Sequence, residues 1–387
     1  MRVHLVSRIF APEPAAASFR LSALAKAFVA SGDAVTVSTS SVPPALRGEP
    51  AEIDGVRIRR APVLRDRTGY VRGYLQYLSF DIPAFFRVLF SRRAEVIVVE
   101  PPPTTGFAVR AAAAIRRTPY AYYAADIWSD ASESTGAPRW VVRAVRRVER
   151  SVLNGARLVI AVSDGVRDRV LEIAPGCRVT VVPNGVDTEV FGGAAAPTDA
   201  GPLAVYAGTA SEWQGADLFI RAMPAVLAIR PDARMVFVGQ GSAWNGLREL
   251  AERIAPDAIE FRNPVRPSEA ARLLGSARAG LVSLKPGLGY DFAVPTKIFA
   301  TAGTGTPVIL ASARAAASSV IEQGGLGDAV GYDVDAVAAA MITRLSEAPS
   351  ASDRASRVAW VETHASSSAR GAEAASAIRV AAASGRS

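Results

Sequence analysis

Residues 281–310 read LVSLKPGLGYDFAVPTKIFATAGTGTPVIL, an order of apolar runs and breakers that indicates a strand, a loop, a helix and a second strand. The first strand ends at Leu284, a loop rich in glycine and proline follows, and PVIL at 307–310 predicts the next strand. Between them, Thr296 is suited to cap a helix that begins near Lys297. Strands joined by helices in this way form parallel sheets that are covered on both faces.

The same alternation runs through most of the chain. Strands are predicted at 2–6, 35–39, 95–99, 119–124, 157–162, 203–207, 234–238, 258–261, 279–284 and 307–310. The pattern restarts after GGAAAPTDAGP at 192–202, which we interpret as a linker between domains. We therefore expect two Rossmann-like, doubly wound domains, at 1–195 and 203–350, that face each other across a cleft. The tail at 351–387 is predicted to be a helix that returns toward the first domain.

Composition limits the function classes. The 387 residues are 50% hydrophobic and 21% charged, which is enough apolar content for two buried cores. The net charge of +8 comes mostly from arginines spread along helices, without the spacing of a zinc finger or a helix-turn-helix. We therefore expect phosphate-bearing ligands or an anionic membrane surface as partners, and no nucleic acid.

The N-terminal run reads as a short strand, not a signal peptide, and no apolar run reaches the roughly 18 residues of a spanning helix. One cysteine excludes an internal disulfide, and a cytoplasmic protein is expected. Two histidines and one cysteine give no metal cluster, and His4 lies inside a predicted strand, where a core position is expected. We therefore expect neither a metal site nor histidine-based catalysis.

The start of the helix near Lys297 has the features of a phosphate site. Backbone amides at a helix N-terminus attract anions, and Lys285 at the strand end and Lys297 in the first turn are placed to flank one. A lysine in a first turn opposes the helix dipole unless an anion is bound. The same residues also fit an ordinary strand–loop–helix corner with a solvated lysine.

The segment PTKIFATAGTGTPVI resembles the PSKIFE-xxA-xGKPVI segment of the family-four glycosyltransferases, which have the GT-B fold. The subgroup that it resembles most makes bacterial exopolysaccharide and O-antigen. Further similar segments, in the same order, are RIFAPEPAAASFRLSALAKAFVASGDAVTVST (8–39), ADIWSD (125–130), VVPNGVD (181–187), VYAGTASEWQGADLFIRAM (205–223) and VFVGQGS (236–242).

This resemblance implies an enzyme that moves a sugar from a nucleotide-diphosphate sugar to a polysaccharide or polyprenyl-linked acceptor, with retention of configuration and without a metal or other cofactor. The C-terminal domain would hold the donor and the N-terminal domain the acceptor. With the phosphate argument above, it indicates as donor-binding residues Gly208, Gly239, Val265, Lys285, Asp291, Ala293, Val294, Thr296 and Lys297.

For the acceptor, the resemblance indicates Glu13 and Arg20. Asp126 and Asp130, at the tip of a predicted strand, are candidates for acceptor binding or proton transfer, although helix capping would also explain them. Trp128 between them is either a core residue or a platform on which a sugar stacks.

Several positions depart from the family pattern. The glutamate that usually binds the nucleotide ribose falls at Ala300, and its partner glutamate falls at Phe292. The arginine and lysine that many members use on the diphosphate fall at Thr209 and Gln214, and a frequent histidine falls at Ala125. A non-catalytic partner protein and a sugar-nucleotide epimerase on the same fold therefore stay open as alternatives.

Residues 70–93, YVRGYLQYLSFDIPAFFRVLFSRR, combine aromatic residues and leucines with arginines at the margins. This composition suits a helix on the membrane surface that reaches a lipid-linked acceptor, and equally a helix packed into the N-terminal domain. The basic stretch RWVVRAVRRVER at 139–150 favours peripheral association with the inner face of the cell membrane.

Overall fold

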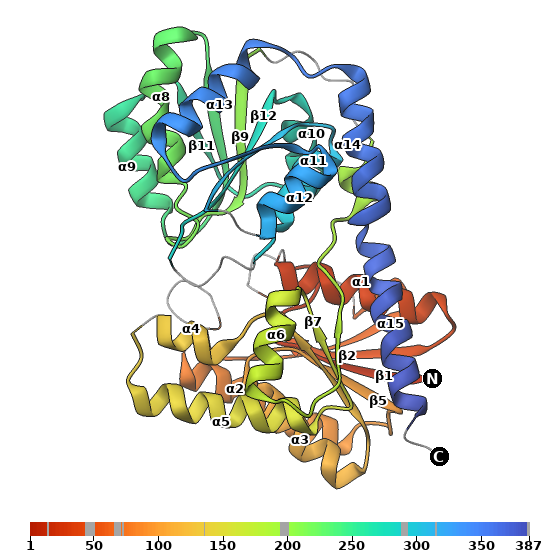
Figure 1. The fold of residues 1–387 in the computed structure, drawn as a ribbon. Helices are drawn as coiled ribbons and strands as arrows, with labels where there is room; N and C mark the ends of the chain where they lie inside the picture. Colours follow the sequence, from red (N-terminus) through yellow and green to blue (C-terminus); the bar gives the residue numbers. More distant parts are fainter. Residues whose placement is uncertain are drawn as a thin grey trace. The chain divides into compact units, whose positions relative to one another are not determined.

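The computed structural model describes the whole chain except residues 14, 43–50, 66–70, 72, 135, 194–200, 288–292, 314–315 and 385–387. The chain divides into two compact units (Figure 1). The first unit comprises Met1–Asn184 and Ser367–Ser387, and the second comprises Gly185–Ser366.

The first unit is built on a sheet in which nearly all strands run parallel. Its strands are β1 (Arg2–Val6), β2 (Ala34–Ser40), β3 (Glu52–Ile53), β4 (Val56–Ala61), β5 (Val96–Val99), β6 (Tyr120–Ala124), β7 (Leu158–Ala161) and β8 (Val179–Val181). They form an 8-stranded sheet in the order β3-β4-β2-β1-β5-β6-β7-β8, and only β3 and β4 pair antiparallel. Because β1 lies between β2 and β5, the strand order reverses there, and such a reversal leaves a crevice at the carboxyl ends of the strands.

Helices cover both faces of this sheet. They are α1 (Ala16–Ala30), α2 (Tyr74–Phe90), α3 (Pro103–Arg116), α4 (Trp128–Ser134), α5 (Arg139–Gly155), α6 (Asp164–Ile173) and α15 (Ser367–Ala383). Helices α1 and α15 pack together over the face that carries Tyr123. The neighbouring Tyr122 points to the opposite face, where its ring lies close to Gly106 of α3. Helix α3 packs against both α2 and α5, so these helices form the second layer.

The second unit repeats the parallel architecture without an antiparallel strand pair among the residues described. Its strands are β9 (Leu203–Thr209), β10 (Arg234–Gln240), β11 (Ile259–Arg262), β12 (Ala279–Leu284), β13 (Val308–Ser312) and β14 (Gly327–Val330). They form a 6-stranded sheet in the order β11-β10-β9-β12-β13-β14, which reverses between β9 and β12. Its helices are α7 (Thr188–Phe191), α8 (Asp217–Ile229), α9 (Trp244–Ile254), α10 (Pro267–Ser276), α11 (Thr296–Gly303), α12 (Ala316–Gly324), α13 (Val334–Ser346) and α14 (Ala351–His364).

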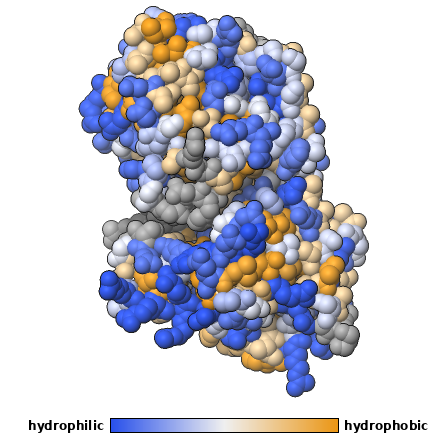
Figure 2. Space-filling model, in the orientation of Figure 1, coloured by the Kyte–Doolittle hydropathy of each residue, from blue (hydrophilic) through white to orange (hydrophobic). Residues whose placement is uncertain are grey.

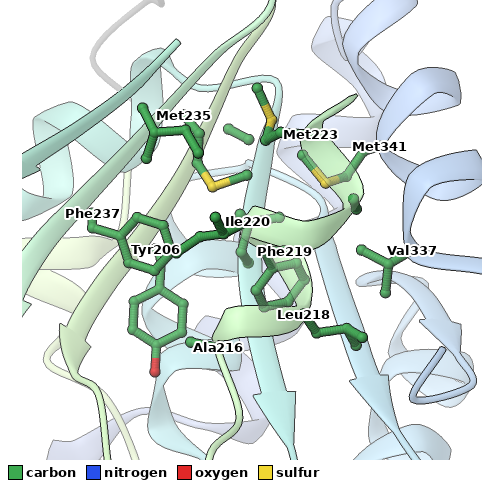
Figure 3. Packing of buried hydrophobic residues seen from close by; sticks show 14 of the residues in the cluster. Tyr206, Ala216, Leu218, Phe219, Ile220, Met223, Met235, Phe237, Val337 and Met341 are labelled. Carbon is green, nitrogen blue, oxygen red and sulfur yellow. The ribbon is translucent and has the colours of Figure 1, made fainter. Parts of the chain in front are cut away.

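The core of the second unit is a buried cluster of aromatic and sulfur-containing side chains (Figure 3). The rings of Tyr206 on β9 and Phe237 on β10 are tilted against each other with centroids 5.2 Å apart, and Phe219 of α8 lies beside Tyr206. Figure 3 shows the Tyr206 hydroxyl at the margin of this cluster, so the ring packs in the core while the hydroxyl points away from it.

Every strand predicted from the sequence is present, and the prediction of two doubly wound parallel sheets is confirmed. His4 is buried, as expected, and its Nε2 lies 2.8 Å from the Ser38 hydroxyl. Strands β3, β4, β8 and β14 lie outside the ranges predicted as strands. In β4, VRIRRA, arginines alternate with apolar residues because one side of this strand faces solvent, whereas β14 is a short edge strand.

The division of the tail differs from the expected one. Only α15 lies in the first unit, whereas α14 belongs to the second. Two buried arginines hold α14 there, because Arg354 donates to the Thr304 carbonyl at 3.2 Å and Arg357 donates to the Gly305 carbonyl at 2.9 Å. These carbonyls end α11, where the helix dipole favours cations. The boundary between the units falls after Asn184, before the linker we inferred, of which residues 194–200 lie outside the described part.

Candidate active site

The start of α11 lies at the point where the strand order of the second sheet reverses. We expected Thr296 to cap this helix, but that expectation was wrong: Pro295 holds the cap position, and Thr296 is the first helical residue. Proline has no side-chain acceptor, so the cap position makes no side-chain hydrogen bond to the first amides. Such a helix start leaves amides for an anion at the carboxyl ends of β9 and β12.

Lys297 reaches from this helix over the end of β9. Its Nζ donates to the Tyr206 hydroxyl at 2.7 Å and to the Thr209 carbonyl, and lies 4.1 Å from the centre of the Tyr206 ring. All these partners are neutral, and no described carboxylate forms an ion pair with Lys297. Burial lowers the pKa of Lys297 to about 7. A half-buried cation without a counter-charge is costly unless an anion comes to it.

Two of the predicted donor-binding glycines make this approach possible. Gly208, at the end of β9, has a φ of +110°, and a Cβ there would lie 3.2 Å from the Lys297 Cε. Gly239, in the adjacent β10, has a φ of +145°, and a Cβ there would lie 2.1 Å from the Gly208 carbonyl oxygen. Any side chain at Gly239 would therefore push the two strand ends apart, and the glycines keep them close beneath the lysine.

Tyr206 and Gln214 complete this corner and were not predicted as site residues. The Tyr206 hydroxyl lies 3.0 Å from the Thr209 carbonyl and 3.3 Å from the Gln214 Oε1. The same amide oxygen accepts the Ser211 N–H at 3.0 Å. Gln214 is buried and stands where many family members have a diphosphate-binding lysine, so here a neutral side chain braces the loop after β9. A tyrosine inside a buried strand has the sequence signature of core packing, which hid its role.

The other predicted donor-binding residues make no described side-chain contact with Lys297. Lys285 is exposed after β12, its backbone N–H donates to the Trp213 carbonyl at 3.0 Å, and no contact with Lys297 is found among the described residues. Val265 follows β11 and packs on an apolar cluster with Leu203 and Leu274. Ala293 and Val294 are half-buried ahead of α11. Asp291 lies outside the described residues.

Of the two glutamate positions, Ala300 packs against an apolar cluster and so offers no carboxylate. Phe292, like Asp291, falls in the segment that the structure does not describe.

In the first unit, a buried ion pair occupies the corresponding reversal between β1 and β5. Arg20 on α1 donates from Nε to Glu100 at 2.9 Å and from Nη1 to the Asn184 Oδ1 at 3.1 Å. The side chains of Arg20 and Glu100 are only 9% and 3% exposed. Arg20, which we expected to bind the acceptor, therefore fixes Glu100 and Asn184 in position. Glu100 could have been found from the sequence, because an acidic residue directly after the buried strand VIVV lies at the carboxyl end of the sheet.

Asp126 follows β6 and lies near this ion pair. Limited hydration among the surrounding protein atoms raises the pKa of its carboxyl group from 3.8 to about 6, against the opposing effect of Arg20 and with a further rise from Glu100. The residue as a whole is nevertheless exposed at the surface, where an acceptor could reach it. A carboxylate with a pKa near the working pH is suited to accept a proton.

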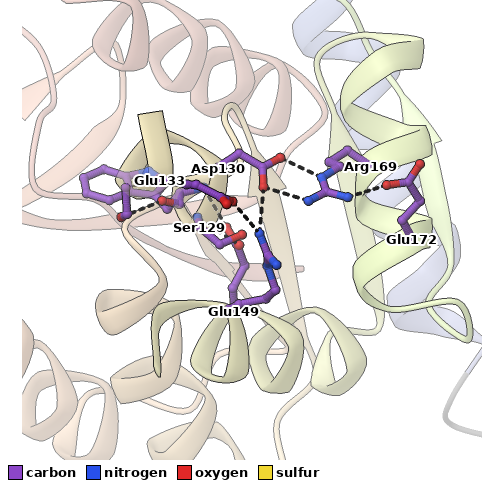
Figure 4. Close-up of polar contacts among 9 residues, drawn as sticks. Ser129, Asp130, Glu133, Glu149, Arg169 and Glu172 are labelled. Carbon is purple, nitrogen blue, oxygen red and sulfur yellow. Dashed lines mark hydrogen bonds and ion pairs between the residues drawn. The ribbon is translucent and has the colours of Figure 1, made fainter. Parts of the chain in front are cut away.

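Asp130 has a different environment (Figure 4). Both of its oxygens accept from Arg169 of α6, at 2.6 Å and 2.8 Å, and Arg146 of α5 lies 3.4 Å away. A carboxylate held in this bidentate way links α4 to α6 and α5. Of the two predicted catalytic candidates, the geometry therefore favours Asp126.

Trp128 is part of a cluster in which one arginine lies over two aromatic rings. The Arg8 guanidinium lies 4.3 Å from the centre of the Tyr77 ring and 5.9 Å from that of Trp128. The two rings meet edge to face at 5.7 Å. Arg8 follows β1, so this cluster also lies at the carboxyl edge of the sheet. The backbone N–H of Trp128 donates to Glu149 at 2.8 Å, and this carboxylate is the cap of α4.

Glu13 lies in the loop after β1 and is half-buried. Its carboxylate is 3.8 Å from Arg65, and burial raises its pKa. Pro14, its neighbour in the matched segment, is not described. No group of histidine, cysteine or acidic residues in the described ranges has the arrangement of a metal site. Among those ranges there is also no helix with the length and apolarity to cross a membrane.

Comparison with known families matches both units. The family described as "Glycosyl transferase 4-like domain" matches residues 16–185, and the family "Glycosyl transferases group 1" matches residues 201–347. A curated relative, the GDP-mannose-dependent monoacylated alpha-(1-6)-phosphatidylinositol monomannoside mannosyltransferase of Corynebacterium glutamicum, is 29% identical over 142 residues. The match covers 35% of this chain and 35% of the length of that relative.

Solved structures match along nearly the whole chain. Sucrose-phosphate synthase from Thermosynechococcus elongatus has a TM-score of 0.77 at 16% identity. The match covers 99% of this chain and 100% of the synthase chain. Anabaena HepE in complex with UDP has a TM-score of 0.72 at 16% identity. The match covers 98% of this chain and 100% of the HepE chain. A structure described as a UDP-N-acetylglucosamine 2-epimerase from Listeria monocytogenes has a TM-score of 0.63 at 13% identity. The match covers 98% of this chain and 95% of that structure's chain. At these identities the similarity shows the fold alone.

Proposed function

Because the chain belongs to the family-four glycosyltransferases and has their GT-B fold, we propose that it moves a sugar from a nucleotide-diphosphate sugar to a glycan or polyprenyl-linked acceptor. In this proposal the second unit binds the donor and the first unit binds the acceptor. The observation that carries it is Lys297, a cation with neutral partners at an uncapped helix start. The resemblance to enzymes of exopolysaccharide and O-antigen synthesis supports a role in making cell-surface glycans.

The donor diphosphate would be held by Lys297, Thr296 and the first amides of α11. Lys297 would contribute most to the electrostatic attraction. Burial destabilises its ammonium form and lowers its pKa to about 7, and a nearby phosphate would stabilise that charged form again. HepE has been solved with UDP and with UDP-glucose, and the mannosyltransferase relative uses GDP-mannose. These relatives support a nucleotide sugar as donor and leave the base and the sugar to be measured.

We further propose transfer with retention of configuration and without a metal. The bond between the anomeric carbon and the phosphate oxygen breaks while the acceptor hydroxyl attacks from the same face. Negative charge then grows on the leaving diphosphate, where Lys297 and the helix amides would stabilise it as a metal does in other enzymes. Asp126, ionised above its pKa of about 6, would take the proton of the acceptor hydroxyl.

The absent ribose carboxylate weakens the donor site relative to the family pattern. A charged hydrogen bond of this kind is worth about 1.5–3 kcal/mol. Ala300 supplies no such bond, which makes a non-catalytic binding protein the second candidate. An epimerase shares only the fold, and a chain with two histidines is poor in the acid–base groups that such chemistry uses.

A thermal-shift screen tests the proposal, using UDP, GDP, ADP and dTDP with their sugars. A ligand of the native state at a hundred times its dissociation constant adds about 2.7 kcal/mol to the free energy of unfolding. We expect one base to stabilise the protein and its nucleotide sugar to give a product of retained configuration by NMR, also in EDTA. Binding without turnover would support the non-catalytic candidate, whereas no binding by any nucleotide would contradict the donor site. Loss of turnover in EDTA that manganese restores would contradict the metal-free mechanism.

A further inference from the structure

The outer side of α2 carries a stripe of exposed apolar side chains. Leu75 is 70% exposed and Phe90 is 77% exposed, and Leu78, Ile82 and Phe86 lie between them at helical spacing. The rings of Phe86 and Phe90 stack with centroids 6.2 Å apart. Apolar surface of this extent is normally turned toward a partner or a membrane.

The neighbouring helices extend this surface. Helix α3, which packs against α2 and α5, exposes Phe107 and Ile115, and α5 exposes Trp140. We call the outer sides of α2 (Tyr74–Phe90), α3 (Pro103–Arg116) and α5 (Arg139–Gly155) the three-helix face. All three helices cover the same side of the first sheet, so their exposed side chains form one surface.

Charge on the three-helix face has a single sign. Helix α5 exposes a row of arginines at helical spacing, Arg139, Arg143, Arg147 and Arg150. Figure 2 shows hydrophilic residues gathered over α5, and hydrophobic residues also reach the surface of the same unit. The acidic residues of α2 and α5, Asp81 and Glu149, are buried, and α3 has none. On the described parts of these helices, therefore, no carboxylate is exposed to balance the arginines.

We propose that the three-helix face docks on an anionic lipid bilayer. The apolar stripe of α2 and α3 would enter the boundary between headgroups and acyl chains, while the α5 arginines would bind lipid phosphates. A second copy of the chain fits less well, because a symmetric pairing of this face would bring like-charged arginine rows together. A nucleic acid would meet the arginines but leave the apolar stripe in water.

Docking at this place would bring lipid close to the predicted acceptor residues. Tyr77, on the inner side of α2, contacts Arg8 and Trp128 at the carboxyl edge of the sheet. A helix is about 10 Å across, so a lipid against Leu78 lies about that far from this cluster. The link to a polyprenyl-linked acceptor rests on the proposed function, whereas bilayer docking does not and can be measured without any sugar.

Vesicle flotation tests the docking. We expect the protein to float with phosphatidylcholine vesicles that contain phosphatidylglycerol at low salt, not with phosphatidylcholine alone, and to be released as salt screens the charges. One arginine near an anionic surface is worth about fivefold in affinity. Replacing Arg139, Arg143, Arg147 and Arg150 by glutamine should therefore weaken binding by at least about a hundredfold. Phe86→Ser with Phe90→Ser should weaken it by at least about tenfold.

Matched controls come from the second unit. Arg253→Gln with Arg272→Gln removes arginines that are also exposed, from helices that carry acidic residues as well, and Ile229→Ser removes an apolar side chain that is 63% exposed. These variants should bind vesicles as the wild type does, and all variants should keep their melting temperature and nucleotide affinity. Absence of wild-type flotation with anionic vesicles, or flotation that survives both sets of changes, would overturn the proposal. So would a concentration-dependent dimer that only the phenylalanine variant abolishes.

Discussion

Lys297 owes its altered pKa to its surroundings, and this gives the site a pH dependence of known sign. The folded chain lowers the pKa of Lys297 from 10.5 to about 7, so between these values the unfolded chain binds more protons. The free energy of unfolding that this group contributes therefore rises with pH across that interval. A bound diphosphate has the opposite preference, because it attracts the protonated lysine.

We predict that nucleoside diphosphate affinity falls as the pH rises from 7 to 9, by up to about tenfold per unit. The ligand's phosphates are already ionised above a pH of about 6, so the effect belongs to the protein. Calorimetric titration in buffers of different ionisation enthalpy should show proton uptake on binding above pH 7. Lys297→Met should bind more weakly, without the pH dependence. A wild-type affinity that stays constant over this range would show that Lys297 does not meet the phosphate.

Asp126 and Asp130 allow a test of the acceptor base. Asp126→Asn should lower the turnover number by about 10²–10⁴ and remove a rise of activity with pH around 6. Folding should not suffer, because the raised pKa means that the ionised carboxylate stabilises the folded chain less than the neutral form does. Asp130→Asn breaks the contact with Arg169 and should cost at most about 1 kcal/mol of stability with a smaller loss of turnover. Equal losses of turnover in two folded variants would contradict the assignment.

At the level of elements, the return of α15 to the first unit depends on close helix packing. Gly371 faces α1, and a Cβ at that position would lie 2.5 Å from the Ala23 carbonyl oxygen. Buried alanines of α15 continue this contact along the helix. The alanines of this tail therefore do more than favour a helix. Their side chains are small because α1 leaves little room for larger ones.

We predict that Gly371→Ala lowers the free energy of unfolding by about 1–3 kcal/mol, although alanine has the higher helix propensity. Gly246→Ala in α9 is the matched control, because a Cβ there meets nothing within 4 Å. This control should leave stability unchanged or raise it by about 0.5–1 kcal/mol. Chemical denaturation of both variants measures the difference. A stabilised Gly371→Ala protein would show that α1 and α15 are not packed as closely as described.

The elements that could be predicted from the sequence are those whose signal is local. Strands buried on both faces, such as VIVV in β5, read as continuous apolar runs. Strand β4 was missed because its outward arginines break that run, and the helix start at Thr296 was misplaced by one residue because proline acts as the cap. Lys297 could be proposed as a site residue because lysine is unexpected in the first turn of a helix.

The partners in the site could not be predicted, because they are distant in sequence. Lys297 and Tyr206 are 91 residues apart, and Arg20 and Glu100 are 80 apart. Nothing local marks such pairs, and they form only once the order of the strands is known. The same holds for Asp130, because nothing near it in the sequence indicated that Arg169 would hold it.

At the level of the whole molecule, the chain crosses between the units twice, after Asn184 and after Ser366. Each unit has its own buried core. We predict that scanning calorimetry resolves separate transitions, of which a nucleoside diphosphate raises only that of the second unit. Ile378→Ala, at a position that is 1% exposed on α15, should lower the first unit's stability by about 2–5 kcal/mol. A single transition that responds equally to ligand and mutation would contradict this independence.

The central claim is that Lys297 binds the diphosphate of the donor, and the affinity of Lys297→Ala for the stabilising nucleoside diphosphate tests it most directly. Lys26→Ala is the control, because Lys26 is an exposed lysine that pairs with Asp54 in the first unit. Loss of one charge-assisted contact predicts an affinity about ten- to a hundredfold lower for Lys297→Ala, with an unchanged or slightly higher melting temperature. The control should bind as the wild type does. An unchanged affinity in a folded Lys297→Ala protein would contradict the account.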